Sequence, residues 1–352
     1  GLERHEVAEA QAGDIVAISG IEGLGISDTL TDPAAPEALP PLSVDEPTIS
    51  MTFQVNNSPF AGHKDFSGGK FLTSRQIRER LMRETLHNVA LRVEDTEDPD
   101  RFKVSGRGEL HLSVLIENMR REGYELAVSR PEVIVKEIDG VRQEPYEHLT
   151  VDVEEAHQGA VMERLGARGG ELQNMMPDGK GRVRLDYIIP SRGLIGFRTE
   201  FMTATSGTGL LHHVFDHYGQ VKPGSFGARQ NGVMVSNATG KALAYSLFNL
   251  QERGRLFIGP GEEVYEGMIV GIHSRDNDLV VNPLKAKHLT NIRAAGSDEN
   301  IILTPPLRLT LEQALEFIDD GELGDVSSNH IRLRQRYLKE HERKRHGRAA
   351  AD

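Results

Sequence analysis

The sequence contains no cysteine and no tryptophan among its 352 residues, and aromatic residues make up only 5% of it. The absence of cysteine excludes a disulfide framework, a thiolate zinc site and a cysteine nucleophile. No apolar run approaches the roughly 18 residues that cross a bilayer, and the N-terminal residues lack the basic and apolar segments of a signal peptide. We therefore expect a cytoplasmic protein with no membrane partner.

The overall charge is acidic, but the basic residues are not evenly spread. A net charge of −12 argues against a protein coated uniformly with basic residues for binding nucleic acid. Basic residues nevertheless cluster in residues 75–83, in residues 275–293 and at the C-terminal end. Such local patches can still bind phosphate groups.

The first part of the chain is predicted to be the end of another domain. Residues 12–21 (AGDIVAISGI) alternate as a strand does, yet a lone strand is not stable. The chain also starts at Gly1 and not at a methionine. We expect residues 1–46 to hold the end of that domain and then a proline-rich linker.

Residues 47–130 are predicted to form a ferredoxin-like βαββαβ module. Thr73 and Gln76 carry the signature of a helix capping box, and Gly123 is placed to end the second helix. The expected elements are a strand at 48–55, a glycine-rich excursion at 56–70, a helix at 74–88, strands at 89–94 and 101–104, a helix at 109–122 and a strand at 124–128.

Residues 131–220 repeat this order without sequence similarity, so we expect a second ferredoxin-like module in tandem with the first. The fold class is predicted as α+β. The expected elements of the second module are a strand at 147–153, a helix at 159–167, strands at 172–176 and 182–189, a helix at 191–205 and a strand at 210–218.

Residues 221–352 are predicted to form a β-rich C-terminal domain with terminal helices, because short apolar runs alternate with glycine. Residues 276–300 lack clear periodicity and are expected to form a long loop. Strands are expected at 232–235, 255–258, 263–264 and 268–273, and helices at 311–319 and 330–348.

Two motifs suggest catalytic or metal sites but do not satisfy their chemistry. The GxGEL run at 106–110 lacks the third glycine of a dinucleotide loop, and no GxxxxGK[ST] loop occurs in the sequence. On a strand, His213 and His217 share one face whereas His212 and Asp216 take the other, so these side chains do not converge on one ion. We predict no catalytic residue, no metal site and no cofactor in this chain.

Residues 275–293 combine cations with short polar donors, which is the chemistry that binds RNA phosphates. The candidate RNA-binding residues are Arg275, Lys285, Lys287, His288, Asn291 and Arg293. A solvated loop is the alternative, and composition leaves it open. The basic residues of 330–348 leave the same choice between binding an anionic partner and simple solvation.

Four longer runs of sequence make a family resemblance visible. They are FQVNNSPFAG at 53–62, GKFLTSRQIRERL at 69–81, GRGELHLSVLIENMRREGYELAVSRPEV at 106–133 and PSRGLIGFRTEFMTATSGTGLLHHVF at 190–215. With these runs the chain resembles, over essentially its whole length, the BipA/TypA family of ribosome-associated translational GTPases. The two modules also resemble domains III and V of elongation factor G. Residues 1–46 resemble the end of the family's domain II, which implies the remnant of a β-barrel at the N-terminus.

This resemblance implies a monomeric factor that binds the 70S ribosome, contacts 23S rRNA and the acceptor end of A-site tRNA, and supports large-subunit assembly in cold or stress. It places GTP and Mg²⁺ in a GTPase domain that this chain lacks, so the chain itself would not be an enzyme. In the family, a loop of the C-terminal domain reaches toward the peptidyl-transferase centre. The basic stretch at 275–293 matches that loop and would contact phosphate and ribose.

Three other interpretations remain open from the sequence. A LepA-like elongation factor would share the two modules but not the NNSPFAG run. A hydrolase or metalloenzyme on the same scaffold requires a metal bound near His213 and His217. A protein-interaction module with no RNA role would fit the acidic net charge.

Overall fold

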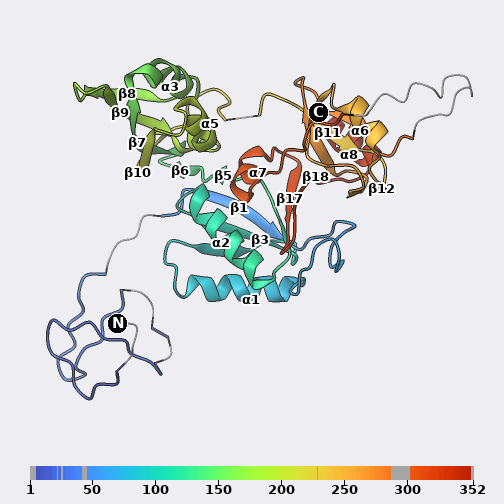
Figure 1. Ribbon diagram of the computed structural model, residues 1–352. Coiled ribbons are helices and arrows are strands. Elements are labelled where there is room, and N and C mark those ends of the chain that lie inside the picture. The colour runs from blue at the N-terminus through green and yellow to red at the C-terminus, as the bar shows by residue number, and fades with distance from the viewer. Residues whose placement is uncertain are drawn as a thin grey trace, which may run out of the picture. The chain divides into compact units, whose positions relative to one another are not determined.

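A computed structural model of the chain (Figure 1) describes residues 5–21, 23–24, 27–41, 46–227, 229–286 and 302–349. The chain divides into two compact units, Gly1–Val44 and Asp45–Asp352. No helix among the described residues is long and apolar enough to cross a membrane.

The first unit contains turns but no helix or strand among its described residues. The predicted strand over residues 12–21 is therefore wrong, whereas the assignment of residues 1–46 to the end of a barrel domain followed by a linker stays a prediction. Ile15 and Ile18 are exposed, and the backbone nearby forms a turn in which Asp14 N donates to Gln11 O at 3.0 Å. A strand needs a neighbouring strand to satisfy its N–H and C=O groups, and the described residues of this unit supply none.

The second unit mixes helices with mainly antiparallel sheets, which confirms the predicted α+β class. Its first sheet has seven strands, and four of them are antiparallel neighbours in the order β4-β1-β3-β2. The elements are β1 (Ile49–Gln54), α1 (Ser74–Thr85), β2 (Arg92–Asp95), β3 (Arg101–Gly106), α2 (Glu109–Glu122) and β4 (Leu126–Val128). Thr73 and Gln76 form the predicted capping box, and Gly123 ends α2 in the left-handed region at φ 96°.

A hairpin from the end of the chain extends this sheet. β17 (Glu322–Val326) pairs with β4 and with β18 (Ile331–Gln335), so the order becomes β18-β17-β4-β1. The predicted helix over residues 330–348 is thus wrong in its first half, because Ile331 and Leu333 alternate with arginines as a strand does. The terminal helices are α7 (Leu311–Phe317) and α8 (Glu340–Ala349).

The second sheet has the order β10-β7-β9-β8. Its elements are β7 (Val141–Glu154), α3 (Glu155–Ala167), β8 (Glu171–Pro177), β9 (Arg182–Pro190), α4 (Ser191–Leu194), α5 (Phe197–Ala204) and β10 (Leu210–Gln220). The two short strands β5 (Glu132–Val133) and β6 (Lys136–Ile138) pair with β1 and β7. The expected helix over residues 191–205 is divided at Gly196, which has a φ of 72°. The division of residues 47–220 into two ferredoxin-like modules stays a prediction, with which both strand orders agree.

The C-terminal strands form a third sheet with the order β13-β15-β11-β16 and a separate strand pair. The elements are β11 (Val233–Ser236), β12 (Gly240–Lys241), α6 (Ala244–Leu250), β13 (Gly254–Leu256), β14 (Glu263–Val264), β15 (Ile269–His273) and β16 (Leu279–Val281). β16 lies within the segment predicted as a loop, and α6 was not predicted. Gly271 must be glycine because a Cβ there would lie 2.5 Å from the carbonyl oxygen of Arg255.

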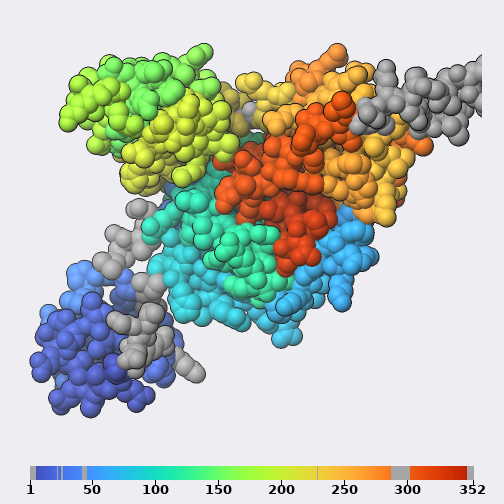
Figure 2. All heavy atoms as spheres, in the orientation of Figure 1, coloured from blue at the N-terminus to red at the C-terminus, as the bar shows by residue number. Residues whose placement is uncertain are grey.

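One apolar core joins the first sheet to the C-terminal sheet. Phe53 and Leu126 of the first sheet, Leu315 of α7, and Val235 and Ile269 of the C-terminal sheet belong to it. Figure 2 shows the residues of α7, β17 and β18, in red, packed between the teal and orange parts of the chain. The segment after residue 221 is therefore not a separate body, because it contributes β17 and β18 to the first sheet, although β10 and β11 on either side of residue 221 lie in different sheets.

Candidate nucleic-acid interface

The described part of the predicted RNA-binding stretch flanks strand β16. Arg275 precedes β16, and its carbonyl oxygen accepts a hydrogen bond from Gly232 N at 2.8 Å, whereas Lys285 follows the strand. Both side chains are exposed, and neither makes an ion pair with another described residue. The structure thus places Arg275 and Lys285 at opposite ends of β16. The other four candidates, Lys287, His288, Asn291 and Arg293, lie outside the described residues.

Helix α6 holds the chain where it approaches residue 287. Ser246 in α6 donates its hydroxyl to Asn282 O at 2.6 Å, and the N-cap Leu243 donates its backbone N–H to Pro283 O at 2.9 Å. The side chain of Asn282 in turn accepts from Leu284 N at 2.9 Å. These bonds fix the backbone of the residues directly before Lys285.

The opposite end of α6 holds the chain at residues 302–304. The C-cap residue Gln251 donates from Nε2 to Ile302 O at 3.0 Å and accepts at Oε1 from Thr304 N at 2.9 Å. Eight residue steps separate the two caps, which corresponds to about 12 Å along a helix. The backbone on either side of residues 287–301 is therefore attached to the two ends of one short helix.

Strand pairing adds two cations that sequence reasoning missed. The carbonyl oxygen of Arg253 accepts from Ser274 N at 2.9 Å, which places Arg253 beside Arg275, and Arg255 pairs with Ile272 in β15. Arg253 and Arg255 are exposed and make no ion pair with a described residue. The run RGR at 253–255, where β13 begins, was the available signal, but its approach to Arg275 depends on the pairing of β13 with β15.

The basic residues near the C-terminus do not form the continuous basic helix that the sequence suggested. Arg334 is 1% exposed, and its Nε donates to both carboxylate oxygens of Asp325 at 2.9 and 3.0 Å. Its Nη2 donates to Asn57 Oδ1 at 2.7 Å. Arg334 thus ties the NNSPFAG run to the β17–β18 hairpin and does not face solvent.

The histidines of β10 are paired separately. Nδ1 of His213 pairs with Glu147, and His217 pairs with Asp216 at 2.6 Å and stacks on Tyr146 with ring centroids 5.1 Å apart. Burial disfavours the charged imidazole of His213, but the bond to Glu147 and its charge outweigh this effect and raise the pKa of His213. Within the described ranges, no group of three histidine or acidic side chains is arranged to hold a metal ion.

The GxGEL run forms a contact between helices. Glu109 begins α2, and its Oε2 accepts from Gly196 N, just before α5, at 3.3 Å. Its Oε1 is buried and has no partner within the described structure. Burial and the charge of Glu316 raise the pKa of Glu109 to about 7. The cavity at this carboxylate is about 120 Å³ and is largely walled by apolar side chains such as Phe197.

Comparison with known proteins gives matches along the whole chain. Residues 231–340 match the TypA/BipA C-terminal domain, and residues 141–226 match the elongation factor G C-terminus. The chain is 66% identical over 352 residues to the large ribosomal subunit assembly factor BipA of Escherichia coli K12, covering all of this chain and 57% of that protein. Over its whole length the chain is similar to BipA, and residues 231–340 match the C-terminal domain of the BipA/TypA family. The resemblance predicted from the sequence is therefore confirmed.

Two more distant members carry the same name. The Haemophilus influenzae protein is 65% identical over 345 residues, and the Buchnera aphidicola protein is 58% identical over 345 residues. Each alignment covers 98% of this chain, with 55% and 56% of the relative. The chain thus spans a little more than half the length of these BipA/TypA relatives. The BipA/TypA-specific match contains α6, Arg253, Arg255, Arg275 and Lys285, so it contains the described cations of the candidate interface.

Proposed function

We propose that this chain binds the 70S ribosome as the RNA-contacting part of a BipA/TypA translational GTPase. In this proposal GTP and Mg²⁺ bind outside residues 1–352, and the complete protein is a cytoplasmic monomer that supports assembly of the large ribosomal subunit, particularly in cold or stress. The 66% identity along all 352 residues to proteins named large ribosomal subunit assembly factor carries the proposal.

The RNA contact is proposed for the basic stretch after β15. Its residues are Arg275, Lys285, Lys287, His288, Asn291 and Arg293, with Arg253 and Arg255 beside Arg275. Among the described residues, Arg253, Arg255, Arg275 and Lys285 are exposed cations with no ion pair to a described carboxylate. Such cations can neutralise phosphates and release the counterions of RNA, which is the main source of affinity for nucleic acid. 23S rRNA and the acceptor end of A-site tRNA are the proposed targets.

The anchoring of the stretch supports a positioning role. Both of its flanks are hydrogen-bonded to α6, and the sheet beside α6 shares a core with the first sheet. A stretch anchored in this way reaches RNA at a fixed place relative to the body of the chain. GTP hydrolysis elsewhere in the protein would then alter affinity at this stretch by reorienting that body on the ribosome.

Co-sedimentation with purified 70S ribosomes across a salt series tests this proposal. The test variant changes Lys285, Lys287 and Arg293 to alanine. The matched control changes Lys64, Arg83 and Lys180 to alanine, which removes the same positive charge. These side chains are exposed and have no ion pair with a described residue.

We expect the test variant to bind more weakly. The magnitude of its negative slope of log K against log salt should be smaller by about 2 to 3, because each phosphate contact contributes about 0.7 to 0.9. The control should follow the unsubstituted chain. Equal losses in the two variants would show that net charge alone drives binding, and binding retained by the test variant would remove the RNA role of the stretch.

A further inference from the structure

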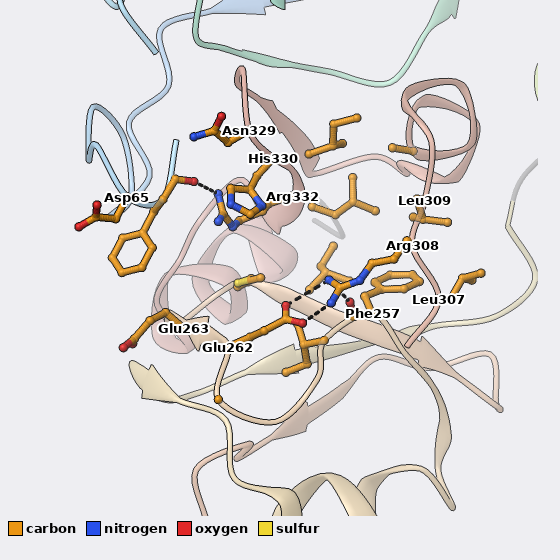
Figure 3. A pocket seen from close by; sticks show the side chains of 18 of the residues that line it. Asp65, Phe257, Glu262, Glu263, Leu307, Arg308, Leu309, Asn329, His330 and Arg332 are labelled. Carbon is orange, nitrogen blue, oxygen red and sulfur yellow. Dashed lines mark hydrogen bonds and ion pairs between the residues drawn. The ribbon is translucent and has the colours of Figure 1, made fainter. Parts of the chain in front are cut away.

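A second cavity lies away from the basic stretch, where the first sheet meets the C-terminal strands (Figure 3). Its volume is about 840 Å³, which falls within the size range of small-molecule sites. Residues from four segments distant in the sequence, 65–66, 257–263, 307–309 and 329–333, form most of its wall. The remaining lining residues are Arg120, Lys241, Met268, Ile269 and Ala314.

Hydrogen bonds between these segments fix the wall. Asn329 N donates to Ser67 O at 3.3 Å, which ties the β17–β18 hairpin to the loop after β1. Leu307 N donates to Leu256 O at 2.8 Å, which ties the strand end of β13 to the segment before α7. The cavity is therefore lined by elements that are hydrogen-bonded to one another.

The cavity contains an arginine that lacks an acidic partner. Arg332 is half-buried, its Nη1 donates to Phe66 O at 2.7 Å, and its guanidinium lies 5.1 Å from the ring centroid of Phe60. No described carboxylate is within ion-pair distance of Arg332. Two residues further along the same strand, Arg334 is fully paired with Asp325, so the absence of a partner is specific to Arg332.

His330 also lines the cavity and, like Arg332, has a lowered pKa. Burial and the positive charge of Arg332 lower the pKa of His330, and burial lowers the pKa of Arg332 as well. Arg308, on the opposite wall, is already neutralised by Glu262 and also donates to Phe257 O at 3.2 Å. Figure 3 shows this pair turned toward Phe257 and away from Arg332. An anion beside Arg332 and His330 would therefore supply the ion-pair partner that Arg332 lacks.

The rest of the cavity suits a ligand with a flat apolar part and hydrogen-bond donors. Phe66, Phe257 and Met268 supply aromatic and thioether surface. Asp65 and Glu263 supply carboxylates that have no ion pair with a described residue. Carboxylates accept hydrogen bonds from ribose hydroxyls and from base amino groups.

We propose that this cavity binds a nucleoside phosphate, with the phosphate on Arg332 and His330, the base against the aromatic wall and donor groups on Asp65 or Glu263. The site is separate from the candidate RNA interface and does not depend on it. A free phosphorylated molecule fits better than a phosphate of folded RNA, because Arg332 is half-buried in the cavity wall and its Nη1 is bonded to Phe66 O.

Isothermal titration calorimetry of the full chain with ADP and GDP tests the proposal, with adenosine, inorganic phosphate and a short single-stranded RNA as comparison ligands. We expect ADP or GDP to bind, adenosine and phosphate to bind at least tenfold more weakly, and R332Q to lose at least tenfold in affinity. The control R336Q should bind as the unsubstituted chain does, because Arg336 is exposed on the same hairpin and makes no ion pair with a described residue.

A measurement on the unsubstituted chain covers the case in which R332Q does not fold. Histidine NMR should show that ADP or GDP raises the pKa of His330, whose signal the variant H330Q identifies. No binding of either nucleotide up to about 1 mM would overturn the proposal. The proposal would also be overturned if phosphate bound as tightly as the nucleotides, or if the His330 signal did not change. It would equally be overturned if RNA bound more tightly than the nucleotides and R332Q lost that RNA binding.

Discussion

The buried pair of Arg334 and Asp325 gives the sharpest prediction for stability. The exposed fractions of the two side chains are 1% and 6%, and Tyr265 donates its hydroxyl to Asp325 Oδ2 at 3.0 Å. Burial raises the pKa of Tyr265 well above its ordinary value, so the phenol keeps its proton and donates. The pair joins β17, β18, the NNSPFAG run through Asn57, and the C-terminal strands through Tyr265.

Replacing Arg334 by methionine keeps much of the apolar volume but leaves the carboxylate of Asp325 buried with only the tyrosine hydroxyl. Breaking a buried pair in this way costs about 3 to 5 kcal/mol. Domains are stable by only about 5 to 15 kcal/mol, so the loss should be large. Replacing both residues, as R334M with D325L, should recover much of it, because no uncompensated charge remains.

Urea unfolding followed by circular dichroism measures the free energy, and hydrogen exchange of the β17 and β18 amides locates the loss. The variant R336M is the matched control, since Arg336 lies one residue beyond β18 and its side chain is exposed. If R334M unfolded at the same urea concentration as R336M, the pair would not stabilise the hairpin. If the double variant were no more stable than R334M, the uncompensated carboxylate would not be the cause.

Two further predictions concern Glu109 and Gln251. Because the pKa of Glu109 is raised from 4.5 to about 7, its ionisation destabilises the folded chain, and stability should fall by about 3 kcal/mol as the pH rises through this interval. E109Q should remove that fall in urea unfolding at pH 5 and pH 8, and an equal fall in both proteins would contradict the assignment. Q251A should weaken ribosome co-sedimentation while lowering the free energy of unfolding by about 1 kcal/mol at most. N249A, on the exposed side of α6, should change neither quantity. Unchanged ribosome binding by Q251A would show that the anchoring by α6 is not needed for binding.

The parts of the fold predicted correctly from the sequence are those with local signals. Helix α2 was placed at 109–122, as observed, because its apolar residues keep helical spacing and Gly123 can adopt a left-handed backbone. The capping box of Thr73 with Gln76 likewise involves residues three positions apart. Signals of this kind do not depend on how distant segments meet.

The wrong predictions involve strands whose partners are distant or missing. The helix predicted over residues 330–348 includes β18, although Ile331 and Leu333 alternate as in a strand, and the sheet of β18 includes β4, about two hundred residues earlier. Residues 12–21 alternate too, but no described strand pairs with them. Alternation indicates a strand only where a partner exists.

The candidate interface was predictable in its chemistry but not in its extent. The cations among short polar residues predict Arg275 and Lys285 as RNA contacts. The sequence could not show that β13 brings Arg253 beside Arg275, nor that Gln251 anchors the far side of the stretch. Both facts follow from tertiary pairing.

Directed hydroxyl-radical probing tests the RNA contact of the basic stretch most directly. Since the chain has no cysteine, K285C carries a single attachment point for an iron chelate, and K64C, in the loop after β1, is the matched control. With 70S ribosomes, we predict cleavage of 23S rRNA from position 285 at sites that the probe at position 64 does not cut. Ribosome binding by the K285C protein without such cleavage would contradict the account.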